Sequence, residues 1–150
     1  VLARGGRAGH AGDDVDEVAD LVAQIEGAGL LDKVGVDQHG LGGILDALDA
    51  AEVPADKIVG VSQGWKMNGA IKTAERKLAE GTLVHGGQPL MAWCVGNAKV
   101  EPKGNAVSIT KQAAGLAKID PLMATFNAVS LLSLNPAAAS GGGFFESFAD

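Results

Sequence analysis

The sequence predicts an α/β fold, because helical and extended patterns alternate along its first half. Apolar residues recur at helical spacing over residues 13–27, 41–53 and 65–80, and short β-branched stretches at 33–37 and 57–61 are typical of strands. This order implies right-handed crossovers and a sheet with parallel neighbours. Hydrophobic residues make up 47% of the 150 residues and charged residues 20%, a composition that folds rather than stays disordered.

The boundaries of these helices are marked by capping residues and glycines. Asp13 or Asp14 is suited to cap the first helix, and Gly27 begins the stretch that ends it. The second helix stops before Pro54, and Gly81 ends the third.

The second half is predicted to hold a short helix, a hairpin and a last helix. Pro89 suits the first position of the short helix. Residues 99–111 alternate around a Lys-Gly-Asn turn, as a hairpin does, and Asp120-Pro121 opens an apolar helix that runs to about residue 134.

Length and composition predict one domain and exclude several classes of protein. We expect a flexible lead-in at residues 1–12, a domain at 13–136 and a disordered low-complexity tail at 137–150. The net charge of −6 argues against a protein that coats nucleic acid through bulk positive charge. The single cysteine, Cys94, excludes an internal disulfide and fits a reducing cytoplasm, and no apolar run approaches the about 20 residues that span a bilayer.

Two carboxylates are the first candidates for a functional site. Asp37 follows a predicted strand beside a glycine turn, where open α/β sheets place their sites, although a strand-ending Asp also caps turns. Asp120 precedes Pro121, a common arrangement at a helix N-cap, and taken alone this favours a capping role over a functional one. If the two carboxylates converge, they are the hard oxygen ligands that Mg²⁺ or Mn²⁺ prefers.

Other polar residues are secondary candidates. Lys111 and Lys118 precede Asp120 in the sequence, and either is suited to steady a scissile phosphate or an attacking water, although most such lysines are simply solvated. His39 is a peripheral candidate two residues after Asp37. Trp65 and Trp93 are expected to pack in the core or at its rim rather than to serve as platforms for base stacking. The glycines that follow Asp37 weakly suggest a phosphate-binding loop, but they lack its lysine.

Four short motifs together resemble one known family. They are Val36–Gly40 (VDQHG), Gly60–Lys66 (GVSQGWK), Trp93–Asn97 (WCVGN) and Lys118–Ala124 (KIDPLMA). In this order and with these gaps, over about residues 10–136, they resemble the C-terminal nuclease domain of the large terminase subunit of tailed bacteriophages and prophages.

The resemblance implies a ribonuclease-H-like fold, in which a mixed sheet is flanked by helices. It also implies a nuclease activity that cuts concatemeric double-stranded DNA with two Mg²⁺ or Mn²⁺ ions. It assigns Asp37 and Asp120 as catalytic metal ligands, gives Lys111 a role in offsetting charge on the phosphate, and places Asn97 near the site. A basic surface would contact DNA through Lys66, Lys72, Arg76 and Lys77.

This chain departs from the family pattern at its start. The first acid of the family lies on an antiparallel meander that has no counterpart before Asp13, so we expect an incomplete domain that lacks its first three strands, with weak or no activity alone. No Walker motif is present, so the packaging ATPase would lie elsewhere. The implied partners are DNA, the portal and the small terminase subunit in the cytoplasm of a bacterial host. Without the meander we expect a homodimer.

Two other interpretations remain open. The same fold would also serve as a non-catalytic docking or assembly module of the packaging motor. An unrelated doubly wound enzyme would instead bind a nucleotide at Gly40, Gly42 and Gly43. Convergence of Asp37 and Asp120 separates the terminase interpretations from the unrelated enzyme.

Overall fold

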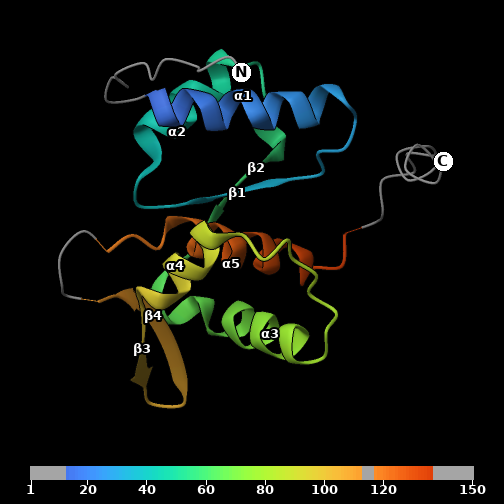
Figure 1. The fold of residues 1–150 in the computed structure, drawn as a ribbon. Helices are drawn as coiled ribbons and strands as arrows, with labels where there is room; N and C mark the ends of the chain where they lie inside the picture. The colour runs from blue at the N-terminus through green and yellow to red at the C-terminus, as the bar shows by residue number, and fades with distance from the viewer. Residues whose placement is uncertain (1–12, 113–116, 137–150) are drawn as a thin grey trace, which may run out of the picture. The chain divides into compact units, whose positions relative to one another are not determined.

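A computed structural model describes residues 13–112 and 117–136, and it confirms a mixed α/β chain (Figure 1). The predicted lead-in at 1–12 and tail at 137–150 lie outside the described residues. The described chain divides into two compact units where one domain was expected. One unit holds residues 13–34 and 39–58, and the other holds residues 35–38, 59–112 and 117–136. The boundary falls inside the two strands that the units share.

The first unit is built on two helices, α1 (Asp13–Gly27) and α2 (Leu41–Ala50), which pack against each other. Ala19 and Leu48 are buried, at 1% and 0% exposure, and supply part of its core. Lys57, at the end of the short 3₁₀ helix η1 (Ala55–Lys57), donates hydrogen bonds to Glu26 Oε2 at 2.7 Å and to the carbonyl of Leu31 at 2.8 Å. The ammonium group therefore joins the end of α1 to the segment that follows it.

The core of the second unit forms where α3 (Asn68–Ala79) packs against α5 (Asp120–Leu132), with α4 (Pro89–Gly96) also in contact with α5 (Figure 1). The small residues Ala70 and Ala74 on α3 are buried in the same cluster as Phe126 and Val129 on α5. Alanines at this spacing let two helices approach closely, and the larger side chains fill the space between them.

The strands form two small sheets. Strand β1 (Val34–Asp37) pairs with β2 (Ile58–Val61), and β3 (Ala98–Lys103) pairs antiparallel with β4 (Ala106–Lys111). The predicted hairpin is thus confirmed, and its turn uses Gly104 at φ +60°. Within the part of the chain that the structure describes, the strands do not join into the single mixed sheet that was expected. The hairpin strands pair with each other along six residues each, and β4 packs on α3 rather than beside β2.

One predicted helix has an irregular start. The single helix expected after Gly64 begins instead as a 3₁₀ turn, η2 (Gly64–Met67), and α3 starts only at Asn68. The Asn68 side chain accepts a hydrogen bond from the backbone N–H of Val107 at 3.0 Å, so β4 holds the junction between the two helices.

Among the helices of the described residues, none combines the length and the apolar character needed to cross a membrane.

Candidate functional site

Asp37 lies at the end of β1, as the sequence predicts, and its side chain is exposed directly after the buried Val36. The next residue, Gln38, donates a hydrogen bond from Nε2 to the carbonyl of Gly60 at 3.3 Å and accepts one from Ser62 Oγ at 3.1 Å. These contacts hold the end of β1 against the end of β2. The position of the Asp37 backbone is therefore set by the neighbouring strand.

Asp120 is the first residue of α5 and is exposed. The alternative interpretation of Asp120 as an N-cap is wrong: the capping position belongs to Ile119, and no side chain there makes a capping hydrogen bond. Within the described residues, the Asp120 carboxylate makes no hydrogen bond or ion pair. An acidic group in the first turn still gains from the helix dipole, and its oxygens remain open to a ligand.

Asn97 forms hydrogen bonds that connect the end of α4 with the segment after β4 and with the segment before Asp120. This residue ends α4, and its Nδ2 donates a hydrogen bond to the carbonyl of Lys118 at 3.1 Å. Its own carbonyl accepts from the backbone N–H of Gln112 at 2.9 Å, one residue after Lys111 at the end of β4. Asn97 therefore connects the end of β4, where Lys111 lies, with the segment that carries Lys118 and leads into α5 at Asp120.

Replacing Asn97 tests this positioning role. We expect Asn97→Ala to lower the free energy of unfolding by about 1 kcal/mol, because the hydrogen bond to Lys118 is lost. Lys118→Ala is the matched control, since it keeps the carbonyl acceptor and removes only an exposed side chain. Urea unfolding of the two variants measures the difference, and equal stabilities would contradict the role given to Asn97.

A buried amide links α5 to β1. Asn127 is 8% exposed; its Oδ1 accepts from Gln63 Nε2 at 3.0 Å and its Nδ2 donates to the carbonyl of Gly35 at 3.4 Å. This amide therefore connects the helix that begins at Asp120 with the strand that ends at Asp37. Sequence reasoning missed both Gln63 and Asn127. The available signal was an amide between Phe126 and Val129 in a mostly apolar helix.

Gly35 permits this close approach of helix and strand. A Cβ at this position would lie 3.0 Å from Val61 Cγ2 and 3.2 Å from Leu131 Cδ1, closer than ordinary van der Waals contact. The glycine is needed for space rather than for a special backbone conformation, since its φ is not positive.

The remaining predicted residues fall on surfaces. Lys111, at the end of β4, and Lys118, two residues before α5, are exposed. His39 is exposed in the turn after β1, and this residue belongs to the first unit. The predicted DNA-binding residues all lie on η2 and α3: Lys66, Lys72 and Arg76 are exposed, and Lys77 is half-buried. Arg76 is partly neutralised, because it donates hydrogen bonds to both carboxylate oxygens of Glu80 at 3.1 and 2.9 Å.

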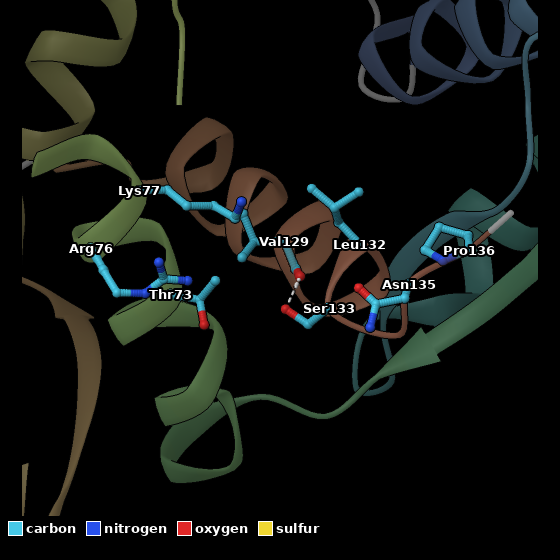
Figure 2. A pocket seen from close by; sticks show the side chains of 8 residues that line it. All are labelled: Thr73, Arg76, Lys77, Val129, Leu132, Ser133, Asn135 and Pro136. Atoms are coloured by element: carbon cyan, nitrogen blue, oxygen red, sulfur yellow. Dashed lines mark hydrogen bonds between the residues drawn. The ribbon is translucent and has the colours of Figure 1, made fainter. Parts of the chain in front are cut away.

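An open pocket of about 500 Å³ lies between α3 and the end of α5, and Figure 2 shows its lining. Arg76 and Lys77 contribute cations, and Ser133 Oγ is occupied by a hydrogen bond to the carbonyl of Val129 at 2.8 Å. The pocket lies at the opposite end of α5 from Asp120. It is therefore separate from the candidate carboxylates, although it shares two residues with the basic surface.

The described acidic groups provide at most part of a metal site. Within residues 13–112 and 117–136, no three His, Cys, Asp or Glu side chains gather closely enough to hold one. Asp37 and Asp120 have the donor chemistry that Mg²⁺ prefers, so they suit part of a site that needs further oxygen ligands.

Comparisons with models of known families, with curated proteins and with solved structures found no match to this chain.

Proposed function

We propose that this chain is the C-terminal part of the ribonuclease-H-like nuclease domain of a phage large terminase subunit, a metal-dependent endonuclease that cuts concatemeric double-stranded DNA. One observation carries the proposal. The hydrogen bond from Asn97 to the carbonyl of Lys118 joins the motif WCVGN to the motif KIDPLMA, which begins 21 residues later. Two motifs that suggest the family in sequence therefore meet at one place in the fold.

Asp37 and Asp120 are the proposed metal ligands. Both are exposed carboxylates in the same compact unit, and Asn127 connects the elements that carry them. Bound Mg²⁺ or Mn²⁺ would activate a water molecule and stabilise the leaving oxygen at the phosphate. The two carboxylates of this chain would hold these cations together with further oxygen ligands.

Lysines supply the positive charge that a phosphate needs. Lys111 lies at the end of β4, one residue before the Gln112 that Asn97 binds, and we assign it to the non-bridging oxygens of the scissile phosphate. The basic surface on η2 and α3 is assigned to the DNA backbone, where each contact releases counterions and makes binding dependent on salt.

Cleavage of supercoiled plasmid DNA tests the proposed function. The intact parent protein is expected to nick and linearise plasmid with Mn²⁺ or Mg²⁺, and to lose this activity when EDTA removes the metal. A parent protein that binds DNA but leaves it uncut with either ion would favour the non-catalytic docking module instead.

We also propose that the isolated chain forms a two-fold homodimer. Val18, Leu21 and Ile25 lie on one side of α1 and are 52%, 56% and 37% exposed, so an apolar strip of this helix faces solvent. Light scattering at micromolar concentration is expected to give about twice the 15.1 kDa of one chain. Leu21→Glu is expected to return the mass to that of a monomer. A monomeric unmodified chain would contradict the proposal.

A further inference from the structure

Trp65 is an exposed aromatic residue on a well-supported turn. It lies in η2, shortly after β2 ends, and 59% of its surface is exposed. Trp65 therefore does not lie in the core, one of the two places expected for it, and its exposure leaves the rim. An exposed indole of this kind offers an aromatic surface on which a ligand can stack.

The turn is fixed on both sides of the indole. Gln63 donates hydrogen bonds to Asn127 Oδ1 and to the carbonyl of Val61, each at 3.0 Å. Met67, two residues after Trp65, is 1% exposed and belongs to the core of the second unit. Because the backbone is held before and after Trp65, a ligand that covers the ring would order little besides the side chain itself.

The charge around the ring suits an anion. Lys66 Nζ lies 6.0 Å from the centroid of the Trp65 ring. From Gly64 to Ala79 the chain carries four basic residues and one acidic residue, whereas the whole chain has a net charge of −6. Positive charge is therefore concentrated on η2, which holds Trp65 and Lys66, and on α3, which follows it.

The other tryptophan has different surroundings. Trp93 is 48% exposed on α4, where Leu90 and Val95 are 61% and 53% exposed, and the eight residues of this helix include no charged side chain. Trp93 therefore lies on an apolar helix without charged residues, whereas Trp65 is followed directly by Lys66 on η2. The two tryptophans provide a matched pair for an experiment.

We propose that Trp65 and Lys66 bind an unpaired nucleotide of a DNA strand, with the base stacked on the indole and its phosphate paired with the ammonium group. A base inside a duplex has both faces covered by its neighbours, so this contact requires a base that has left the stack, as in a single strand or an opened segment. The inference rests on the proposed function, because DNA is there the substrate, and it adds an unpaired base as the bound form.

Tryptophan fluorescence isolates this contact, because the chain has two tryptophans and no tyrosine. Trp93→Phe leaves Trp65 as the only emitter, and Trp65→Phe leaves Trp93. With EDTA and low salt, a single-stranded oligonucleotide is expected to quench the emission of Trp65 and to leave that of Trp93 nearly unchanged. A strand of the same length with abasic sites keeps the phosphates and is expected to quench Trp65 much less.

Affinity measurements separate stacking from charge. Trp65→Ala is expected to weaken binding of the single strand about 5- to 100-fold, the range that removal of one stacking aromatic produces. Lys66→Gln is expected to reduce the slope of log affinity against log salt by about 0.7. Circular dichroism is expected to show both variants folded, since each side chain is exposed.

Two results would overturn the inference: no quenching of Trp65 by the oligonucleotide, or equal quenching by the abasic strand. Because these measurements use no metal, they are independent of cleavage. If Trp65 fails to respond while the parent protein still cuts DNA, the stacking contact is wrong and the nuclease proposal stands. If Trp65 responds and the parent cuts nothing, the stacking contact stands and the nuclease proposal fails.

Discussion

Asp120→Asn in the intact parent protein is expected to lower Mn²⁺-dependent DNA cleavage about 100-fold or more while leaving DNA binding nearly unchanged. The substitution keeps the size of the side chain and removes the charge that would hold the cation. Duplex affinity comes mainly from lysine and arginine contacts to phosphates, so it is not expected to change. Asp37→Ala is expected to give the same loss, because both carboxylates serve one site. Plasmid cleavage and a DNA-binding titration measure the two quantities.

Thermal melts of the variants distinguish the loss of a metal ligand at Asp120 from a loss of stability at the start of α5. Asp120 gains at most about 1 kcal/mol from its place in the first turn of α5, and Asp120→Asn is expected to cost no more than that in a thermal melt. Asp49→Asn on α2 is a matched control, because it also removes an exposed helical carboxylate and is expected to cleave normally. Normal cleavage by Asp120→Asn would show that the metal-ligand assignment is wrong.

Phe126→Ala is expected to give the largest loss of stability, about 3–5 kcal/mol in the free energy of unfolding. Phe126 is 7% exposed and lies in the buried cluster with Ile71 and Val129, so its removal leaves a cavity between α3 and α5. Urea unfolding followed by circular dichroism measures the change. Leu132→Ala provides the comparison, because Leu132 is 55% exposed on the same helix and is expected to cost under about 1 kcal/mol. Similar losses in both variants would contradict the assigned core.

Much of the secondary structure follows from local patterns. The apolar spacing that predicted α3 and α5 reflects the packing of one helix face, and Ile71 and Phe126 are buried as that spacing requires. The alternation around Gly104 likewise predicted the hairpin, because a glycine at positive φ closes the turn. Asp37 at the end of β1 was predicted for the same reason: a short β-branched run ends in a polar residue.

Contacts between distant residues could not be predicted in this way. Gln63 and Asn127 are 64 positions apart, and a hydrogen bond between their amides leaves no periodic signal in the sequence. The 3₁₀ start of α3 depends on a hydrogen bond from Val107 to Asn68, which belongs to the tertiary fold. The division into two compact units was also missed, because the boundary falls within strands rather than in a Gly- or Pro-rich linker.

The crowding around Gly35 has a consequence for how relatives of this chain can vary. The space for a side chain at position 35 is already filled by Val61, Leu131 and Asn127. The Cβ atom of Asn127 would lie 3.4 Å from a methyl group added at position 35. An alanine at 35 therefore requires the Val61 and Leu131 side chains to shift by a few tenths of an ångström, and a smaller neighbour, as in Val61→Ala, removes that need. We expect positions 35, 61 and 131 to change together when homologous sequences are aligned, with a gain of volume at 35 matched by a loss at 61 or 131.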